Sequence, residues 1–215
     1  MIRHFEPSDL PLCMQEVRRY AQLKDDTLTD RLTALLPDAL AQVHGRVCYD
    51  LFPVQPLGSG QIDLGFSVVS SQSLCHLLRH ASRCVVFAAT IGLAYDRHIA
   101  RISGLSRADG WLVHALGTER VESLCDAFEY YLKEEGYHIT RRFSPGYGDV
   151  PLELQRDVFR ALDCPRQIGL TLTDSLLMSP SKSVTAIIGL TETSEPVSDR
   201  CTACPQVSCA FRSQP

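Results

Sequence analysis

The sequence predicts an α+β fold built on a largely antiparallel sheet, with a short cysteine-containing tail at the C-terminus. Short apolar stretches typical of strands are mixed with helical stretches of unequal length, without the regular strand–helix–strand spacing of a parallel sheet. Residues 83–90, RCVVFAAT, are apolar from Cys84 to Ala89 and are the best candidate for a buried central strand. From residue 192 onward the composition becomes polar, which sets the tail apart.

The N-terminal part is expected to be helical. Ser8 can cap a helix that runs to about Leu23. A second helix over residues 27–44 carries helically spaced leucines. Pro37 is expected to kink or split this helix, because proline lacks the N–H that an interior helical position donates.

Strands and one further helix lead up to the central strand. Residues 46–54 and 62–69 are expected to be strands, separated by a Gly/Pro-rich loop over residues 55–61. Ser70 or Ser71 begins the helix that precedes the central strand.

The second half contains one long helical region, over residues 106–135. Its apolar residues have roughly helical spacing, but Gly117 interrupts them, so the region forms one helix or two. A strand over residues 137–143, a helix over 151–162 and a last strand over 183–191 complete the predicted fold.

The composition is that of a soluble globular protein with a sizeable core. Of the 215 residues, 45% are apolar and 21% charged, and a net charge of −4 gives no reason to expect nucleic acid. The start of the chain lacks the apolar region of a signal peptide, and the longest apolar run, residues 84–94, is too short to span a membrane. A cytoplasmic location is expected, so the nine cysteines are mostly free thiols or metal ligands.

The turn over residues 141–150, RRFSPGYGDV, combines groups that suit a small-molecule site. Arg142 can hold a carboxylate through two parallel hydrogen bonds, and Gly146 lets the backbone approach a ligand closely. Tyr147 can stack on a base or donate to an oxygen. These groups fit a zwitterionic or nucleoside-like molecule. On spacing alone, a strand-ending turn with a solvated arginine is the simpler interpretation.

Two ordered motifs favour the small-molecule site over a simple strand-ending turn. RFSPGYGDVP is followed about twenty residues later by LTLTDSLLMSPSKSVTAIIGL, and the helical stretch ALGTERVESLCDAFEYYLKEE precedes both. This arrangement resembles the activation domain of cobalamin-dependent methionine synthase, over about residues 65–192. The signature is Arg-x-x-Pro-Gly-Tyr, a proline four residues past the tyrosine, and Leu-Thr-acid-Ser…Met-x-Pro…Ser-Val. The matching residues are Arg142, Pro145, Gly146, Tyr147, Pro151, Leu172, Thr173, Asp174, Ser175, Met178, Pro180, Ser183 and Val184.

The resemblance implies a fold and a function. The family's domain is a twisted antiparallel sheet with flanking helices, and it binds S-adenosylmethionine in a groove. When the cobalt of the synthase is oxidised to cob(II)alamin, an electron from a reduced carrier gives cob(I)alamin, which the bound S-adenosylmethionine methylates. The domain holds the methyl group above the corrin, a positioning role rather than acid–base chemistry.

The resemblance also implies the site residues. Arg142 would pair with the ligand's carboxylate. Gly146 and its neighbours Phe143 and Pro145 would line the adenosine, and Tyr147 would pack beside them.

An acidic residue on the preceding helix completes the contacts that the resemblance implies. Asp126 falls at that place, and Glu122, one helical turn earlier on the same face, is the alternative. A solvated helix carboxylate explains either residue about equally well. The family's tyrosines after the final strand have no counterpart, since Tyr147 is the last tyrosine of the chain.

The chain is expected to divide into a domain over residues 1–195 and a tail over residues 196–215. In the tail, Cys201, Cys204 and Cys209 have the spacing C-x2-C-x4-C, which suits a shared zinc ion or iron–sulfur cluster. A fourth ligand would have to come from another cysteine or from outside the protein. Reduced thiols in a flexible tail are the alternative.

These features predict an accessory protein that binds S-adenosylmethionine and reactivates a separate cobalamin-dependent methionine synthase core, or another corrinoid protein, in trans. Its electron donor would be a protein such as a flavodoxin or ferredoxin. It would turn nothing over alone, and no catalytic residue is expected. The first alternative is an iron–sulfur electron-transfer or redox protein that serves corrinoid methyltransferases. The second is a scaffold that shields the cobalamin domain. Neither nucleic acid nor a membrane is an expected partner.

Overall fold

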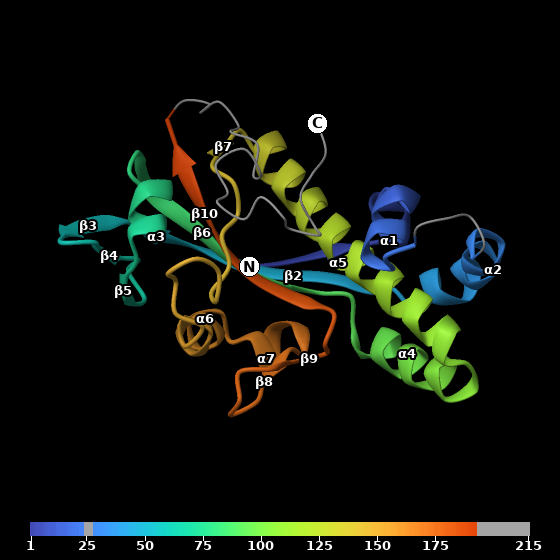
Figure 1. The fold of residues 1–215 in the computed structure, drawn as a ribbon. Coiled ribbons are helices and arrows are strands. Elements are labelled where there is room, and N and C mark those ends of the chain that lie inside the picture. Colours follow the sequence, from blue (N-terminus) through green and yellow to red (C-terminus); the bar gives the residue numbers. More distant parts are fainter. Residues whose placement is uncertain (24–27, 193–215) are drawn as a thin grey trace.

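The computed structural model describes residues 1–23 and 28–192, and one five-stranded sheet lies at their centre (Figure 1). Every neighbouring pair of its strands is antiparallel. The strand order is β1 (Ile2–Phe5), β2 (Gly45–Pro53), β6 (Ala81–Thr90), β10 (Ser183–Thr191) and β7 (His138–Ile139). Together with helices on both faces, this sheet confirms the predicted α+β class, a twisted antiparallel sheet with flanking helices.

The central strand β6 is buried on both faces. Val85 and Phe87 belong to the core on one side of the sheet, and Cys84 and Val86 to the core on the other side. Successive side chains point to opposite faces, so a strand covered on both sides is apolar throughout. The strand predicted over residues 83–90 therefore has the predicted position, buried from Cys84 onward.

Helices cover the first face of the sheet. The longest, α5 (Arg107–Glu134), crosses this face (Figure 1). Three other helices pack against α5: α1 (Met14–Tyr20), α2 (Thr29–Leu40) and α4 (Leu93–Leu105). Within residues 1–23 and 28–192, no helix is long and apolar enough to cross a membrane.

Shorter elements cover the opposite face. Helices α3 (Gln72–Leu77), α6 (Leu154–Leu162) and α7 (Cys164–Ile168) bury apolar side chains against it. Beside them lie a small three-stranded sheet and a two-stranded hairpin (Figure 1). These are β3 (Gln55–Gly58), β4 (Gln61–Asp63) and β5 (Val68–Ser70), and then β8 (Thr171–Leu172) and β9 (Met178–Ser179).

Helix α5 is continuous although Gly117 lies within it. A Cβ atom on Gly117 would come within 2.4 Å of Cε1 of the Tyr95 ring. Tyr95, from α4, is fully buried, and its hydroxyl donates to the Val113 carbonyl at 3.0 Å. Glycine at this position therefore marks a close approach of α4 to α5 rather than a break, and α5 is one helix.

The N-terminus differs from the prediction. An edge strand, β1, comes first, and Ser8 lies in a 3-10 turn, Pro7–Asp9, so the first helix begins only at Met14. Most side chains of β1 are exposed, so the sequence carries no apolar alternation that would reveal this strand. Helix α2 runs through Pro37 without splitting.

The predicted loop over residues 55–61 and strand over residues 62–69 form the small three-stranded sheet instead. The chain reverses near Gly60 and Gly65, whose φ angles are +77° and +76°. Glycine reaches such positive φ values at little cost, so it suits tight hairpins. The predicted loop marked the turn at Gly60 correctly, but Gly65 lies inside the stretch predicted as one strand, so its turn was missed. The short, largely exposed strands gave no apolar signal.

The second half matches the prediction in part. The last strand has the predicted bounds, residues 183–191. The strand predicted over residues 137–143 pairs with the sheet at β7 and again at Phe143, and the helix predicted from Pro151 begins at Leu154. Helices α4 and α7 and the β8–β9 hairpin were not predicted. The start of α3 is confirmed, because the Ser71 hydroxyl accepts the Leu74 N–H at 3.0 Å.

We expect Gly117→Ala to lower the free energy of unfolding by about 1 to 3 kcal/mol, because the added methyl group overlaps the buried Tyr95 ring. This loss should occur even though alanine is a better helix former by about 1 kcal/mol. Gly104→Ala on α4 is the matched control, since a Cβ there meets nothing within 4 Å. Urea unfolding measures both. A gain in stability of the same size for both variants would contradict the close approach of the two helices.

Candidate functional site

One edge of the sheet is only partly covered. Strand β7 pairs with Leu190 and Thr191, at the end of β10, and Phe143 then pairs with Ile187 through two backbone hydrogen bonds of 2.9 Å. After Phe143 the chain leaves the sheet in a turn. Backbone groups alternate along a strand, so Thr185 presents its N–H and C=O to the same edge as Ile187, where the chain has already turned away.

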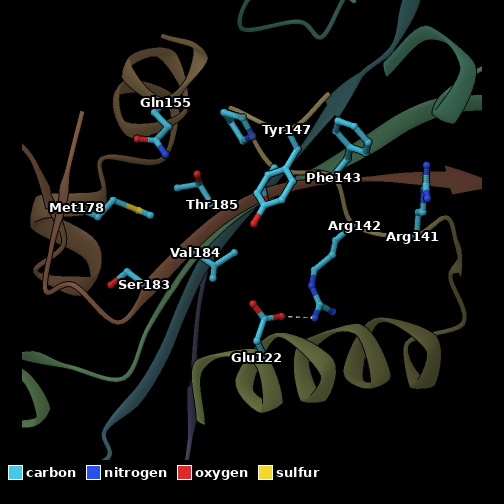
Figure 2. A pocket seen from close by; sticks show the side chains of 12 residues that line it. Glu122, Arg141, Arg142, Phe143, Tyr147, Gln155, Met178, Ser183, Val184 and Thr185 are labelled. Atoms are coloured by element: carbon cyan, nitrogen blue, oxygen red, sulfur yellow. Dashed lines mark hydrogen bonds and ion pairs between the residues drawn. The ribbon is translucent and has the colours of Figure 1, made fainter. Parts of the chain in front are cut away.

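The pairing of Phe143 orients the residue before it. Arg142 extends toward helix α5, and only 7% of its side chain is exposed (Figure 2). Its Nη2 donates to Glu122 Oε2 at 2.8 Å, and its Nη1 donates to Asp126 Oδ1 at 2.6 Å and to Glu129. These acidic residues lie on one face of α5 at spacings of four and three residues, so one guanidinium reaches all of them.

This Arg142 cluster has more negative than positive charge. One guanidinium faces three carboxylates, so the formal charge of the four groups is −2. Burial by itself lowers the pKa of Arg142, but the surrounding anionic groups, Glu129 and Asp126 among them, raise it above its usual value. Arginine carries five N–H donors. Three of these N–H groups donate to the carboxylates. The other two have no acceptor among the described residues, so they are available to a ligand.

The turn after Phe143 is held in a compact shape by its own backbone. Gly146 has φ +88°, and its N–H donates to the Val150 carbonyl at 3.0 Å. The Val150 N–H in turn donates to the Tyr147 carbonyl at 3.0 Å. A Cβ on Gly146 would lie 3.0 Å from Leu152, so glycine satisfies both the positive φ and the tight contact.

Asp149 ties this turn to the N-terminus of α3. Its carboxylate accepts the Ser71 hydroxyl at 2.6 Å and the Gln72 N–H at 2.6 Å, with a longer bond from the Ser73 N–H at 3.2 Å. Carboxylates satisfy the unpaired N–H groups at a helix start. The hydrogen bond from Ser71, with those from the α3 backbone, lowers the pKa of Asp149 to about 2.

A pocket of about 390 Å³ lies between this turn, α5, α6 and the start of β10. Figure 2 shows Arg142 and Glu122 at one end of it and Gln155 and Met178 at the other. The ring of Tyr147 projects from the turn into the space between them. Pockets of this size commonly hold small molecules. The lining residues are Glu122, Arg141, Arg142, Phe143, Ser144, Pro145, Tyr147, Gln155, Met178, Ser183, Val184 and Thr185.

Most of the predicted binding residues meet in this pocket. Arg142, Phe143, Pro145 and Tyr147 line it, and Gly146 shapes the turn that carries them. Their contact with a ligand remains a prediction.

The two acidic candidates lie on different sides of the Arg142 cluster. Glu122 belongs to the pocket wall. Asp126, one turn further along α5, lines an adjoining groove of about 790 Å³ between α5 and the N-terminal segment. Glu122 and Arg142 line both spaces, and the N-terminal residues Asp9 and Glu16 add further acidic groups to the groove. The pocket therefore places Glu122 nearer to a ligand held by the signature turn.

Comparison with known proteins agrees with this geometry. Residues 126–197 match the family model described as vitamin B12 dependent methionine synthase, activation domain. The family resemblance inferred from the sequence is thereby confirmed. The structure also resembles the crystal structure of the MetH reactivation domain bound to AdoHcy, with a TM-score of 0.58 and 19% sequence identity. That likeness covers 92% of this chain and 81% of the other, and it shows a shared fold. No curated protein matches the sequence.

The predicted metal ligands of the tail fall outside the region that the structure describes. Cys201, Cys204 and Cys209 lie beyond residue 192. Among residues 1–23 and 28–192 there is no group of three or more His, Cys, Asp or Glu side chains that could hold a metal ion. Metal binding by the tail therefore stays a prediction from the sequence.

Several residues of this pocket and its surroundings were not predicted. Glu129 was detectable, because Glu122, Asp126 and Glu129 follow the spacing of one helix face. Asp149 lies within the signature turn, but its partner, the start of α3, is about 77 residues away in sequence. Gln155 and Thr185 gave no signal, since neither lies at a motif position of the activation-domain signature.

The depressed pKa of Asp149 predicts how stability depends on pH. Because its pKa falls from 3.8 to about 2 on folding, its carboxylate stabilises the folded state above about pH 4, and this contribution is lost as pH falls toward 2. Asp149→Asn should therefore lower the melting temperature at pH 7 and differ less from wild type at pH 2.5. Asp50→Asn is the control, because Asp50 is exposed and accepts the N–H of the adjacent Leu51. A gap between wild type and Asp149→Asn that stays constant with pH would contradict the capping role.

Proposed function

We propose that this protein binds S-adenosylmethionine in the pocket beneath the signature turn and serves reductive remethylation of a corrinoid protein. The observation that carries the proposal is the position of Arg142. Its guanidinium lies at one end of a pocket of suitable size, with two N–H donors beyond its three carboxylate bonds. A guanidinium with free donors fits the carboxylate of an amino-acid ligand. The activation-domain match over residues 126–197 supports the same ligand.

The charges of S-adenosylmethionine complement the Arg142 cluster. The ligand carries one carboxylate, one ammonium and one sulfonium group, so its formal charge is about +1 at neutral pH. Its carboxylate would take the remaining donors of Arg142, while its cationic groups would face the excess carboxylates. Glu122, in the pocket wall, is the nearest candidate for the ammonium, and Asp126 is the second. The cluster is formally −2, so the ligand's positive charge relieves repulsion among its carboxylates.

The proposed chemistry needs positioning rather than proton transfer. A flavodoxin or ferredoxin would supply one electron to cob(II)alamin on the partner, and S-adenosylmethionine would supply the methyl group. The products would be methylcobalamin and S-adenosylhomocysteine. This chain would hold the ligand with its methyl group directed at the partner's corrin. It would act in trans on a cobalamin-dependent methionine synthase core and turn over nothing alone.

We further propose that residues 1–195 act as one domain and that residues 196–215 form a separate tail. The alternative function, iron–sulfur electron transfer, depends on Cys201, Cys204 and Cys209 of that tail. No observation among the described residues favours it. The pocket and its signature residues favour the ligand-binding function instead.

Arg142→Lys should weaken binding of S-adenosylhomocysteine by about 30-fold to 1,000-fold, or about 2 to 4 kcal/mol, when measured by calorimetry. Lysine keeps the positive charge that the three carboxylates need, but it lacks the planar fork. We prefer it to alanine, which would leave those carboxylates without a partner and destabilise the fold.

Arg160→Ala provides the control for this measurement. Arg160 lies on α6 with its side chain 80% exposed and does not line the pocket, so its loss should leave the affinity unchanged. The melting temperature of each variant separates lost binding from lost folding. Equal affinity of wild type and a folded Arg142→Lys variant would move the carboxylate site elsewhere, and absence of binding by the wild type, with or without its partner, would refute the proposed ligand.

A further inference from the structure

The far end of the pocket holds two buried polar atoms without a hydrogen-bond partner. Gln155 is 6% exposed and Thr185 is 2% exposed, and both line the pocket. Within the described residues, neither Gln155 Oε1 nor Thr185 Oγ1 has a partner. Buried polar groups are almost always hydrogen-bonded, and leaving one unpaired costs stability. Two such atoms in one pocket indicate a place where a ligand supplies the missing bonds.

Gln155 is also an exception on its own helix. The buried side of α6 consists of Leu154, Gln155, Val158, Phe159 and Leu162, so a polar amide occupies a position in an apolar stripe. Packing alone would favour an apolar residue there. The amide points toward the pocket in Figure 2, beside Thr185 and the Tyr147 ring. Its position therefore suits recognition rather than stability.

Thr185 belongs to the partly covered edge of the sheet. It lies two residues before Ile187 on β10, where the chain after Phe143 has already left the sheet. Its side chain points to the same face as that of Ile187, which is the face covered by α6. A ligand at this edge can contact both the threonine hydroxyl and its backbone.

We propose that Gln155 and Thr185 form the subsite that recognises the base of the ligand and selects adenine. This inference rests on the proposed function, because it assumes a nucleoside whose carboxylate end is held by Arg142. Adenine offers an exocyclic amino group, which donates, next to a ring nitrogen, which accepts. Gln155 Oε1 is an acceptor, and the Thr185 hydroxyl can donate, so the pair matches this edge. Hypoxanthine replaces the amino group with a carbonyl oxygen, so the Gln155 amide would have to turn over and present its NH2 group to bond to this base.

The position of the pair agrees with the length of the ligand. Arg142 and Gln155 lie at opposite ends of the pocket, and the Tyr147 ring lies between them (Figure 2). With the amino-acid part at Arg142, the base falls at the Gln155 end. The Tyr147 ring then lies beside the nucleoside, where an aromatic face can pack against it.

The test compares S-adenosylhomocysteine with S-inosylhomocysteine, its hypoxanthine analogue, by calorimetry on the full-length protein. Wild type should prefer the adenosyl compound by about tenfold or more. Gln155→Leu should lose about tenfold in affinity for S-adenosylhomocysteine and most of the preference, whereas Gln155→Glu, which keeps an acceptor, should retain the preference. Thr185→Val should also weaken binding of the adenosyl compound. Gln167→Leu, at an exposed position on α7, is the control and should bind like wild type.

Stability provides a second readout that a purely structural role would not give. Removal of an unsatisfied buried group should leave the melting temperature of the free Gln155→Leu protein unchanged or higher. Equal binding of the two nucleosides by wild type would overturn the subsite, and so would a Gln155→Leu variant that loses both equally or melts lower. Failure of wild type to bind either nucleoside would instead refute the proposed function, so the two failures are distinguishable.

Discussion

The backbone pairing between Phe143 and Ile187 holds the signature turn against β10. Because two hydrogen bonds fix Phe143 at the edge of the sheet, Arg142 must point toward α5, and the chain after it must turn away from the sheet. The outer edge of β10 at its start, Ser183 to Thr185, is left to line a pocket instead of meeting a further strand. The turn keeps its shape because Asp149 anchors it to α3, so the pocket depends on contacts between distant segments.

Both ends of the pocket contain groups that are energetically unfavourable in the free protein and that a ligand can satisfy. At the Arg142 end, three carboxylates surround one guanidinium, so negative charge is in excess. At the other end, Gln155 and Thr185 bury polar atoms without partners. Neither feature favours the free protein, and binding sites often retain such unfavourable arrangements because they increase affinity. A zwitterionic nucleoside with additional positive charge would satisfy both ends at once.

The sequence predicted those features that depend on local pattern. β6 and β10 are largely apolar strands at the predicted places, and Ser71, one of the two predicted residues, caps α3. Exposed strands such as β1 escaped prediction, because backbone pairing holds them and their side chains carry no apolar pattern. Gly117 suggested a break in the long helix. Glycine is needed there because the Tyr95 ring, from a different helix, leaves no room for a side chain.

In the pocket, too, the sequence predicted what depends on local pattern and missed what depends on contacts between distant residues. Motif residues such as Arg142 and Tyr147 could be named from the sequence, since their order and spacing are specific to the activation domain. The roles of Gln155 and Thr185 follow from burial and from the missing partners of their polar atoms, which only the folded chain reveals.

Remethylation in trans is the most direct test of the proposed function. A cob(II)alamin-loaded methionine synthase core is mixed with this protein, a one-electron reductant and methyl-labelled S-adenosylmethionine, and the corrinoid spectrum and label are followed. Labelled methylcobalamin and an equal amount of S-adenosylhomocysteine should form, much faster with wild type than with Arg142→Lys. A cob(II)alamin spectrum that stays unchanged with every corrinoid partner tried, while S-adenosylmethionine still binds, would contradict it.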